Sequence, residues 1–366
     1  MRNRQQITAI QLAIVIYLIA IGTIYFPAAG IVVPLAGTAG WMAITIAFLI
    51  GLLWVGLAVL LCHWAPSGNF TEAVFTWFGS WVGRGLLVYL LAIGVWLGSL
   101  LMLQGSLVFH AIALPATPPL ALTLSTLILI VWTDLKGIEV YLRTVQLLFF
   151  LGAPLIAGLL FGTIPLADLG RLLPLFGKGP VGLAKATYQA LPWAMDGTIF
   201  TLFLGSMVSD KERLGRWTVL PILAAGLSLA GFVLLTIAEL GIGVAESFVY
   251  PTAQLALSSR LGGFLQGLEL FFYPLWLVTT YIKSTAFFVL ASECLCGFLP
   301  PLRQPWRALL LGAAYLAISR MPQNINEMAG SIARVNNSVV AAFYWLLPLL
   351  LILAWWRRRK RSAKAS

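Results

Sequence analysis

The stretch IAIGTIYFPAAG, residues 19–30, interrupts the first long apolar run of the chain near its middle. Gly22, Thr23, Pro27 and Gly30 fall within a few positions of one another there, although glycine and proline are poor helix formers. Unpaired backbone groups are costly in hydrocarbon, so a broken helix persists only where protein or a water-filled cavity receives them. The alternative is a proline kink with close helix packing through the glycines. The stretch therefore indicates either a cavity or a kink near mid-span.

The composition indicates whether this chain folds in water or in a membrane. Its 366 residues are 60% hydrophobic and 10% charged, and the mean hydropathy is +0.95. A chain of this composition would expose large apolar areas in water, so we expect an integral membrane protein. The apolar run that starts near residue 7 is too long for the core of a secretory signal and lacks a clean cleavage site, so we expect it to be retained.

Apolar runs long enough to cross a bilayer, at roughly 20 residues each, number ten. We predict a single transmembrane domain over residues 1–356, followed by a basic cytoplasmic tail at 357–366. No separate soluble domain is expected, because the connections between the runs are short. The predicted spans lie near 8–35, 40–62, 84–109, 119–135, 144–166, 187–207, 217–240, 264–293, 306–322 and 336–356.

The distribution of basic residues predicts which side of the membrane each end of these spans faces. With the N-terminus inside, most lysines and arginines fall on the cytoplasmic side, so the positive-inside rule predicts a multi-pass cell-membrane protein with both termini in the cytoplasm. The same asymmetry explains the net charge of +11 without nucleic acid as a partner. The tail RRRKRSAK, residues 357–364, is typical of a juxtamembrane stop that also attracts anionic lipid.

The three cysteines, Cys62, Cys294 and Cys296, fall at predicted cytoplasmic ends of spans, where thiols stay reduced. No disulfide framework is therefore expected. The spacing of Cys62 and His63 relative to the other two is not that of a zinc finger, so interfacial packing is favoured over a metal site.

A second interruption is predicted in the sixth span, in LPWAMDGTIF, residues 191–200, where Pro192 and Gly197 bracket Asp196. Broken helices at matching positions of two five-span halves are typical of inverted-repeat transporters, which bind ligands at the midplane. We therefore predict an all-α membrane protein with a five-plus-five inverted-repeat bundle and broken helices one and six. Asp196 either caps the resumed half-helix or contacts a ligand, and the two roles are compatible.

The eighth span carries a polar stripe. At about 100° per residue, Glu269, Tyr273, Trp276, Thr280 and Lys283 fall within roughly 40° of one line. Glu269 and Lys283 lie about 21 Å apart along the helix axis and cannot pair directly. Lys283 either snorkels to the cytoplasmic headgroups or is a fixed ammonium that bridges the first and eighth spans in place of a coupling cation.

Several stretches together resemble the spore permease family, the B-type integral-membrane subunits of nutrient germinant receptors, within the amino acid–polyamine–organocation superfamily. The resemblance runs through about residue 300. The family usually has an arginine where Gly267 stands here, and often a glycine where Ile24 stands. The stretches are ITAIQL (7–12), IGTIYFP (21–27), PSGNFTEAVFTWFGSWVG (66–83), LPATPP (114–119), LKGIEVYLR (135–143), LLPLFG (172–177), SDKERL (209–214), YPTAQL (250–255) and FLQGLELFFYPLWLVTTYIKS (264–284).

This resemblance implies that a small nutrient, such as an amino acid, is recognised near the two span breaks. It also implies partners, namely an A-type subunit and a lipoprotein C-type subunit in the spore inner membrane. We expect Lys283 and Glu269 to be a cation substitute or structural charges. The expected ligand contacts are Gly22, Thr23, Ile24, Ala194, Asp196, Gly197, Trp276 and Thr280.

No enzyme chemistry is visible in the sequence. His63 and His110 fall on opposite sides of the predicted membrane, and no phosphate-binding loop is present, so we expect neither catalysis nor a cofactor. Two functional classes remain: a ligand-sensing receptor subunit, and a secondary amino acid transporter coupled to protons or sodium. The family resemblance favours sensing.

Overall fold

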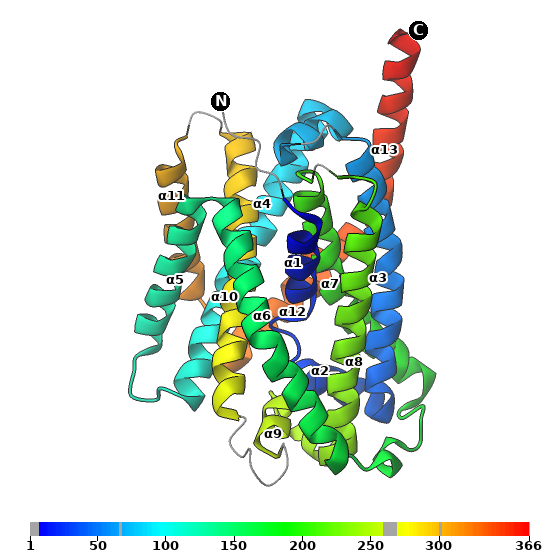
Figure 1. The fold of residues 1–366 in the computed structure, drawn as a ribbon, viewed down its shortest axis with the longest axis vertical. Helices are drawn as coiled ribbons and strands as arrows, with labels where there is room; N and C mark the ends of the chain where they lie inside the picture. Colours follow the sequence, from blue (N-terminus) through cyan, green and yellow to red (C-terminus); the bar gives the residue numbers. More distant parts are fainter. Residues whose placement is uncertain (1–6, 66–67, 209, 259–268, 300–301, 366) are drawn as a thin grey trace.

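The computed structural model describes residues 7–65, 68–208, 210–258, 269–299 and 302–365. Over these ranges the secondary structure is helical apart from loops and one isolated bridge between Ile7 and Val208. The helices lie mostly side by side in one bundle (Figure 1). The predicted all-α class is confirmed.

The first half of the chain begins with the predicted break. The first span is divided into two short helices, and residues 22–27 between them form turns. The next helices follow the predicted spans, with short 3₁₀ segments η1 (Gly37–Ala39), η2 (Ile164–Leu166) and η3 (Leu169–Leu172) beside them. The helices of this half are α1 (Ala9–Ile21), α2 (Ala28–Ala36), α3 (Gly40–His63), α4 (Phe70–Ile112), α5 (Pro119–Lys136) and α6 (Ile138–Thr163).

Helix α4 contains two parts that meet at Gly79. This residue has φ 79° and ψ −178°, a backbone conformation that favours glycine. The part before it is capped by Asn69, whose side chain accepts a hydrogen bond from the Thr71 amide at 3.0 Å. Because the chain turns at Gly79, residues 70–78 form a short helix of their own at one end of the bundle (Figure 1).

Among the described residues, the second half contains five long helices and three further elements, two of which lie outside the predicted spans. The long ones are α7 (Gly179–Gly205), α8 (Leu214–Ser247), α10 (Glu269–Phe298), α11 (Gln304–Ser319) and α13 (Ala341–Ala365). The others are α9 (Pro251–Ser258), α12 (Ile325–Val335) and the π-helical segment η4 (Asn336–Val340). Helix α12 was missed because it is amphipathic rather than apolar. Helix α13 continues into the basic tail instead of ending before it.

The predicted break in the sixth span is wrong. Helix α7 is continuous from Gly179 to Gly205, and Pro192 lies inside it. A proline removes the helical hydrogen bond of its missing N–H, and its ring crowds the carbonyl four residues earlier. A membrane helix tolerates this where its surroundings satisfy the freed groups. The acceptor that Pro192 leaves without its helical donor is the Tyr188 carbonyl, four residues earlier. The Tyr344 hydroxyl donates to the Leu191 carbonyl oxygen beside the proline and ties this segment to α13. The two halves therefore differ at this point, and the inverted repeat stays a prediction.

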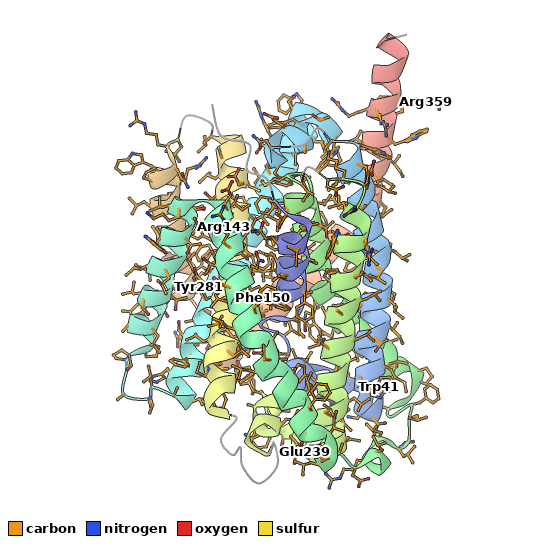
Figure 2. All side chains as sticks on the ribbon, in the orientation of Figure 1. Trp41, Arg143, Phe150, Glu239, Tyr281 and Arg359 are labelled. Atoms are coloured by element: carbon orange, nitrogen blue, oxygen red, sulfur yellow. The ribbon has the colours of Figure 1, made fainter. Side chains whose placement is uncertain are left out.

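Seven helical stretches in the described residues are long and apolar enough to cross a membrane. Helix α1 is apolar but short, because the break divides the first span. The described structure has a helix or helix pair at every predicted range, and ten crossings remain a prediction. The start of α1 and the end of α13 lie at the same end of the bundle (Figure 1), as an even number of crossings requires. Arg143 and Arg359 lie toward this end and Glu239 toward the other (Figure 2).

Candidate functional site

The break in the first span is a compact turn at the centre of the bundle. The Gly22 amide donates to the Leu18 carbonyl oxygen at 2.7 Å, and the Tyr25 amide donates to the Ile21 carbonyl oxygen at 3.2 Å. Helix α2 then starts with the Ala28 amide bonded to the Ile24 carbonyl oxygen at 2.9 Å. The turn is deeply buried, so its remaining polar groups need partners from neighbouring helices or from a ligand.

One such partner is Thr279 of α10. Its hydroxyl donates to the Gly22 carbonyl oxygen at 2.7 Å and shares the proton with the Trp276 carbonyl oxygen at 2.8 Å. A Cβ at Gly22 would lie 2.4 Å from the Leu18 carbonyl oxygen and 3.4 Å from Thr279 Cβ. The close contact that favours glycine here is with Leu18 of the same helix, whereas the Thr279 contact is an ordinary van der Waals distance. The hydrogen bond from Thr279 joins the first and eighth spans.

The charged centre of the site is an ion pair between α7 and α10. Lys283 Nζ lies 2.7 Å from Asp196 Oδ2, and the side chains are only 2% and 7% exposed. Asp196 Oδ1 has no hydrogen-bond partner within the described residues. A buried charge without a counter-charge is strongly destabilising, whereas a close pair compensates much of the desolvation cost. The pair thus compensates its own charges and ties α7 to α10.

This geometry decides between the two interpretations of Lys283. Snorkelling is wrong, because the ammonium is buried rather than extended to the surface. The lysine is fixed inside the bundle, where its partner is the Asp196 carboxylate, and its role as a substitute cation stays a prediction. No first-span carbonyl accepts a hydrogen bond from it among the described residues, and Thr279 takes the Gly22 carbonyl instead. The buried lysine therefore links the sixth and eighth spans, not the first and eighth.

Aromatic rings surround the turn on the side of α10. The Phe26 ring lies 4.8 Å from the Trp276 ring, 5.5 Å from the Tyr250 ring and 6.1 Å from the Tyr273 ring, measured between centroids. The indole nitrogen of Trp276 is buried and has no hydrogen-bond partner within the described structure. A buried Trp N–H usually finds an acceptor, so this donor is available to a polar ligand.

Two threonine hydroxyls near these aromatic rings are also buried without a hydrogen-bond partner in the described part of the chain. Thr23 in the turn and Thr198 on α7 have buried hydroxyl oxygens without a partner among the described residues. These two hydroxyls, the Trp276 indole nitrogen and Asp196 Oδ1 come from three elements, namely the turn, α7 and α10. Such groups carry a desolvation cost unless something bonds them, and a small polar ligand or water satisfies them equally well in chemical terms.

A cavity of about 570 Å³ lies beside the turn, between α2, α4, α7, α12 and the segment 246–250. Its size lies within the range of roughly 300–1,000 Å³ of small-molecule sites. Two carboxamides bond across its wall, since Asn337 Nδ2 donates to Gln189 Oε1 at 2.6 Å. The lining includes Ile24, Pro27, Gly30, Gln104, Gln189, Trp193, Tyr250 and Asn337.

Three other predicted ligand contacts pack against protein groups, and their role in binding stays a prediction. Ala194 faces α3, where a Cβ on Gly51 would approach its own Cβ to 2.5 Å. Gly197 faces α8, because a Cβ there would lie 2.1 Å from Ile222 Cδ1. The Thr280 hydroxyl donates to the Trp276 carbonyl oxygen of its own helix at 3.0 Å. Glu269 begins α10, and its side chain lies outside the described residues.

Sequence reasoning missed Thr279, Phe26 and Tyr250. Thr279 lies about 100° from the stripe through Thr280, so a search for polar residues on one face excluded it. The paired threonines at 279 and 280 were a usable signal, because a helix bearing both presents hydroxyls in two directions. Phe26 and Tyr250 carry no separate sequence signal, since an aromatic residue in a membrane protein is most often a packing residue.

Three comparisons place this arrangement among known proteins. The fold is similar to that of Mhp1, a nucleobase-cation-symport-1 family transporter, in a closed conformation with bromovinylhydantoin bound, at TM-score 0.68 and 14% identity over 95% of this chain and 78% of that one. It is similar to MhsT in complex with L-phenylalanine, at TM-score 0.68 and 16% identity over 96% and 89%. Inward-facing Mhp1 gives TM-score 0.57 and 16% identity over 92% and 76%. No curated protein matches the chain significantly.

The bundle and its broken first helix have the fold of a membrane transporter, as these neighbours do. The family model described as "Spore germination protein" matches residues 6–328, which is most of the chain. The chain therefore belongs to the spore germination permease family. The match extends beyond the sequence stretches that first indicated it.

Proposed function

We propose that this chain is the nutrient-binding membrane subunit of a spore germinant receptor. The nutrient, an amino acid in this proposal, binds at the turn of residues 22–27 and is reached through the cavity beside Ile24 and Pro27. The unpartnered polar atoms of Thr23, Thr198 and Trp276 are suited to a ligand with both donors and acceptors. The L-phenylalanine bound to MhsT, a protein of similar fold, supports the choice of an amino acid.

The observation that carries the proposal is the buried pair of Asp196 and Lys283. It supplies an internal cation at the point where α7 meets α10, so binding needs no ion from solution to hold these helices together. A receptor benefits from that arrangement, because its ligand response then depends on nutrient alone. The binding energy of the nutrient shifts the population of conformations, and the A-type and C-type subunits in the spore inner membrane respond to that shift.

The alternative is a secondary amino acid transporter coupled to protons or sodium. The specific observation in its favour is the fold, which is shared with Mhp1 and MhsT. Fold alone does not establish function, since one fold hosts many activities. The two proposals predict different results when ion gradients are imposed.

The deciding experiment uses the full chain, purified and reconstituted into proteoliposomes. Equilibrium binding and uptake of the twenty radiolabelled L-amino acids are measured with and without sodium and proton gradients. We expect saturable binding of at least one amino acid that sodium does not change, and no accumulation against a gradient. Gradient-driven accumulation would contradict the receptor proposal and support the transporter. Binding of none of them, together with normal germination of spores that lack the gene, would remove the nutrient-binding role.

A matched pair of glycine variants tests where the ligand binds. Gly22→Val places a bulky side chain against the turn, and we expect it to abolish nutrient binding while folded protein remains in the membrane. Gly56→Val is the control, because a Cβ at Gly56 would meet no atom within 4 Å. Unchanged titrations in both variants would place the ligand away from the turn.

A further inference from the structure

A second cavity, of about 380 Å³, lies behind the turn, between α1, α6, α8 and α10. It is separate from the cavity beside Ile24, because the two share no lining residue. An engineered apolar cavity of roughly 150 Å³ already stays dry and takes up benzene. The walls are mostly aliphatic and aromatic and include Leu18, Leu148, Phe149, Ile156, Leu275 and Val278.

The few hydroxyls on the walls of this cavity are already bonded to protein. The Tyr17 hydroxyl donates to Ser228 Oγ at 3.2 Å. The Thr279 hydroxyl donates to the Gly22 carbonyl oxygen at 2.7 Å. The cavity consequently presents carbon rather than hydrogen-bonding groups, which disfavours water and polar solutes as occupants.

The cavity is continuous with the lipid-facing surface of the protein. All of its lining residues lie within predicted membrane spans, and one of them, Phe161 at its edge, is 67% exposed. Neighbouring positions on α6, namely Leu147, Phe150 and Leu151, are 55% to 63% exposed. Figure 2 shows Phe150 on α6 at the front of the bundle. In a membrane-embedded chain these side chains contact acyl chains, so hydrocarbon is what reaches the opening.

We propose that this cavity holds one acyl chain of a bilayer phospholipid. A void of this size would leave its walls without van der Waals partners, and an acyl chain supplies them. The chain inserts from the face of α6 and packs against Leu18 and Thr279, directly behind the hydrogen bond that joins α1 to α10. Occupancy therefore stabilises the observed position of α1, and bilayer composition regulates how readily the first span moves.

The test is photolabelling of the full chain in nanodiscs that contain a phospholipid with a diazirine in the middle of one acyl chain. Labelled peptides are mapped by mass spectrometry. We expect preferential labelling of residues 148–161 and 275–282. In Ala157→Phe the phenyl ring occupies the cavity and displaces two or more methylene groups, so labelling of these segments falls about tenfold.

The control is Leu151→Phe, on the same helix but not on the cavity wall, where the side chain is 63% exposed. It keeps the labelling of the wild type. If Ala157→Phe fails to fold, Ala153→Leu makes a smaller change in the same wall and lowers labelling to an intermediate level. Equal labelling in the wild type and a folded wall variant, or labelling spread evenly along the exposed face of α6, overturns the proposal.

Discussion

Removing either member of the Asp196–Lys283 pair tests whether it holds the bundle together. Lys283→Met leaves a buried carboxylate without a counter-charge, and Asp196→Asn leaves a buried ammonium in the same position. Both side chains are almost inaccessible, at 7% and 2% exposure, so little solvent screening relieves the remaining charge. Breaking a buried pair from one side costs about 3–5 kcal/mol, and we expect a loss of that size in each variant.

The double variant Asp196→Asn/Lys283→Met removes both charges together. Replacing a buried pair with neutral groups is often close to neutral in stability, so we expect most of the loss to be recovered. The measurement is the free energy of unfolding in mixed micelles for the wild type, both single variants and the double variant. Their double-mutant cycle gives the coupling energy, which we expect to reach about 3 kcal/mol.

A second ion pair of the same chain supplies the control. Lys178 Nζ and Glu246 Oε1 lie 2.9 Å apart, but their side chains are 48% and 33% exposed. Because water screens that pair, Lys178→Met is expected to cost at most about 1 kcal/mol. Single variants at Asp196 and Lys283 that each change stability by less than about 0.5 kcal/mol, with additive effects, would refute the reasoning.

Two further variants test packing around the turn. Thr279→Val keeps the side-chain shape but leaves the Gly22 carbonyl without its hydrogen bond, so we expect a loss of about 0.5–1.5 kcal/mol in the free energy of unfolding; an unchanged value would show that another donor replaces the hydroxyl. Gly197→Ala brings a methyl group against Ile222, so we expect a loss of about 1–3 kcal/mol that Ile222→Val partly restores; nutrient binding lost at unchanged stability would instead indicate a ligand contact.

The sequence predicted the membrane class, the helical fold and the break in the first span because each depends on local chemistry. A chain that is 60% hydrophobic has only helices or closed barrels available in a bilayer. Glycine and proline both lower helix propensity, and the clustering of Gly22, Pro27 and Gly30 made an interruption of the first span a prediction from sequence alone. The polar stripe of α10 also followed from helical periodicity alone, and it placed Lys283 on the face that turned out to be buried.

The partners of these residues were decided only by the tertiary structure. Nothing in the periodicity of α10 states which carboxylate Lys283 meets, because that depends on the rotation and depth of α7 beside it. The same applies to Gly197, read from sequence as a break and found packed against Ile222 in a continuous helix. Whether a proline interrupts a membrane helix depends on how its surroundings accommodate the ring and the freed carbonyl, and that condition belongs to the packed bundle, not to the segment.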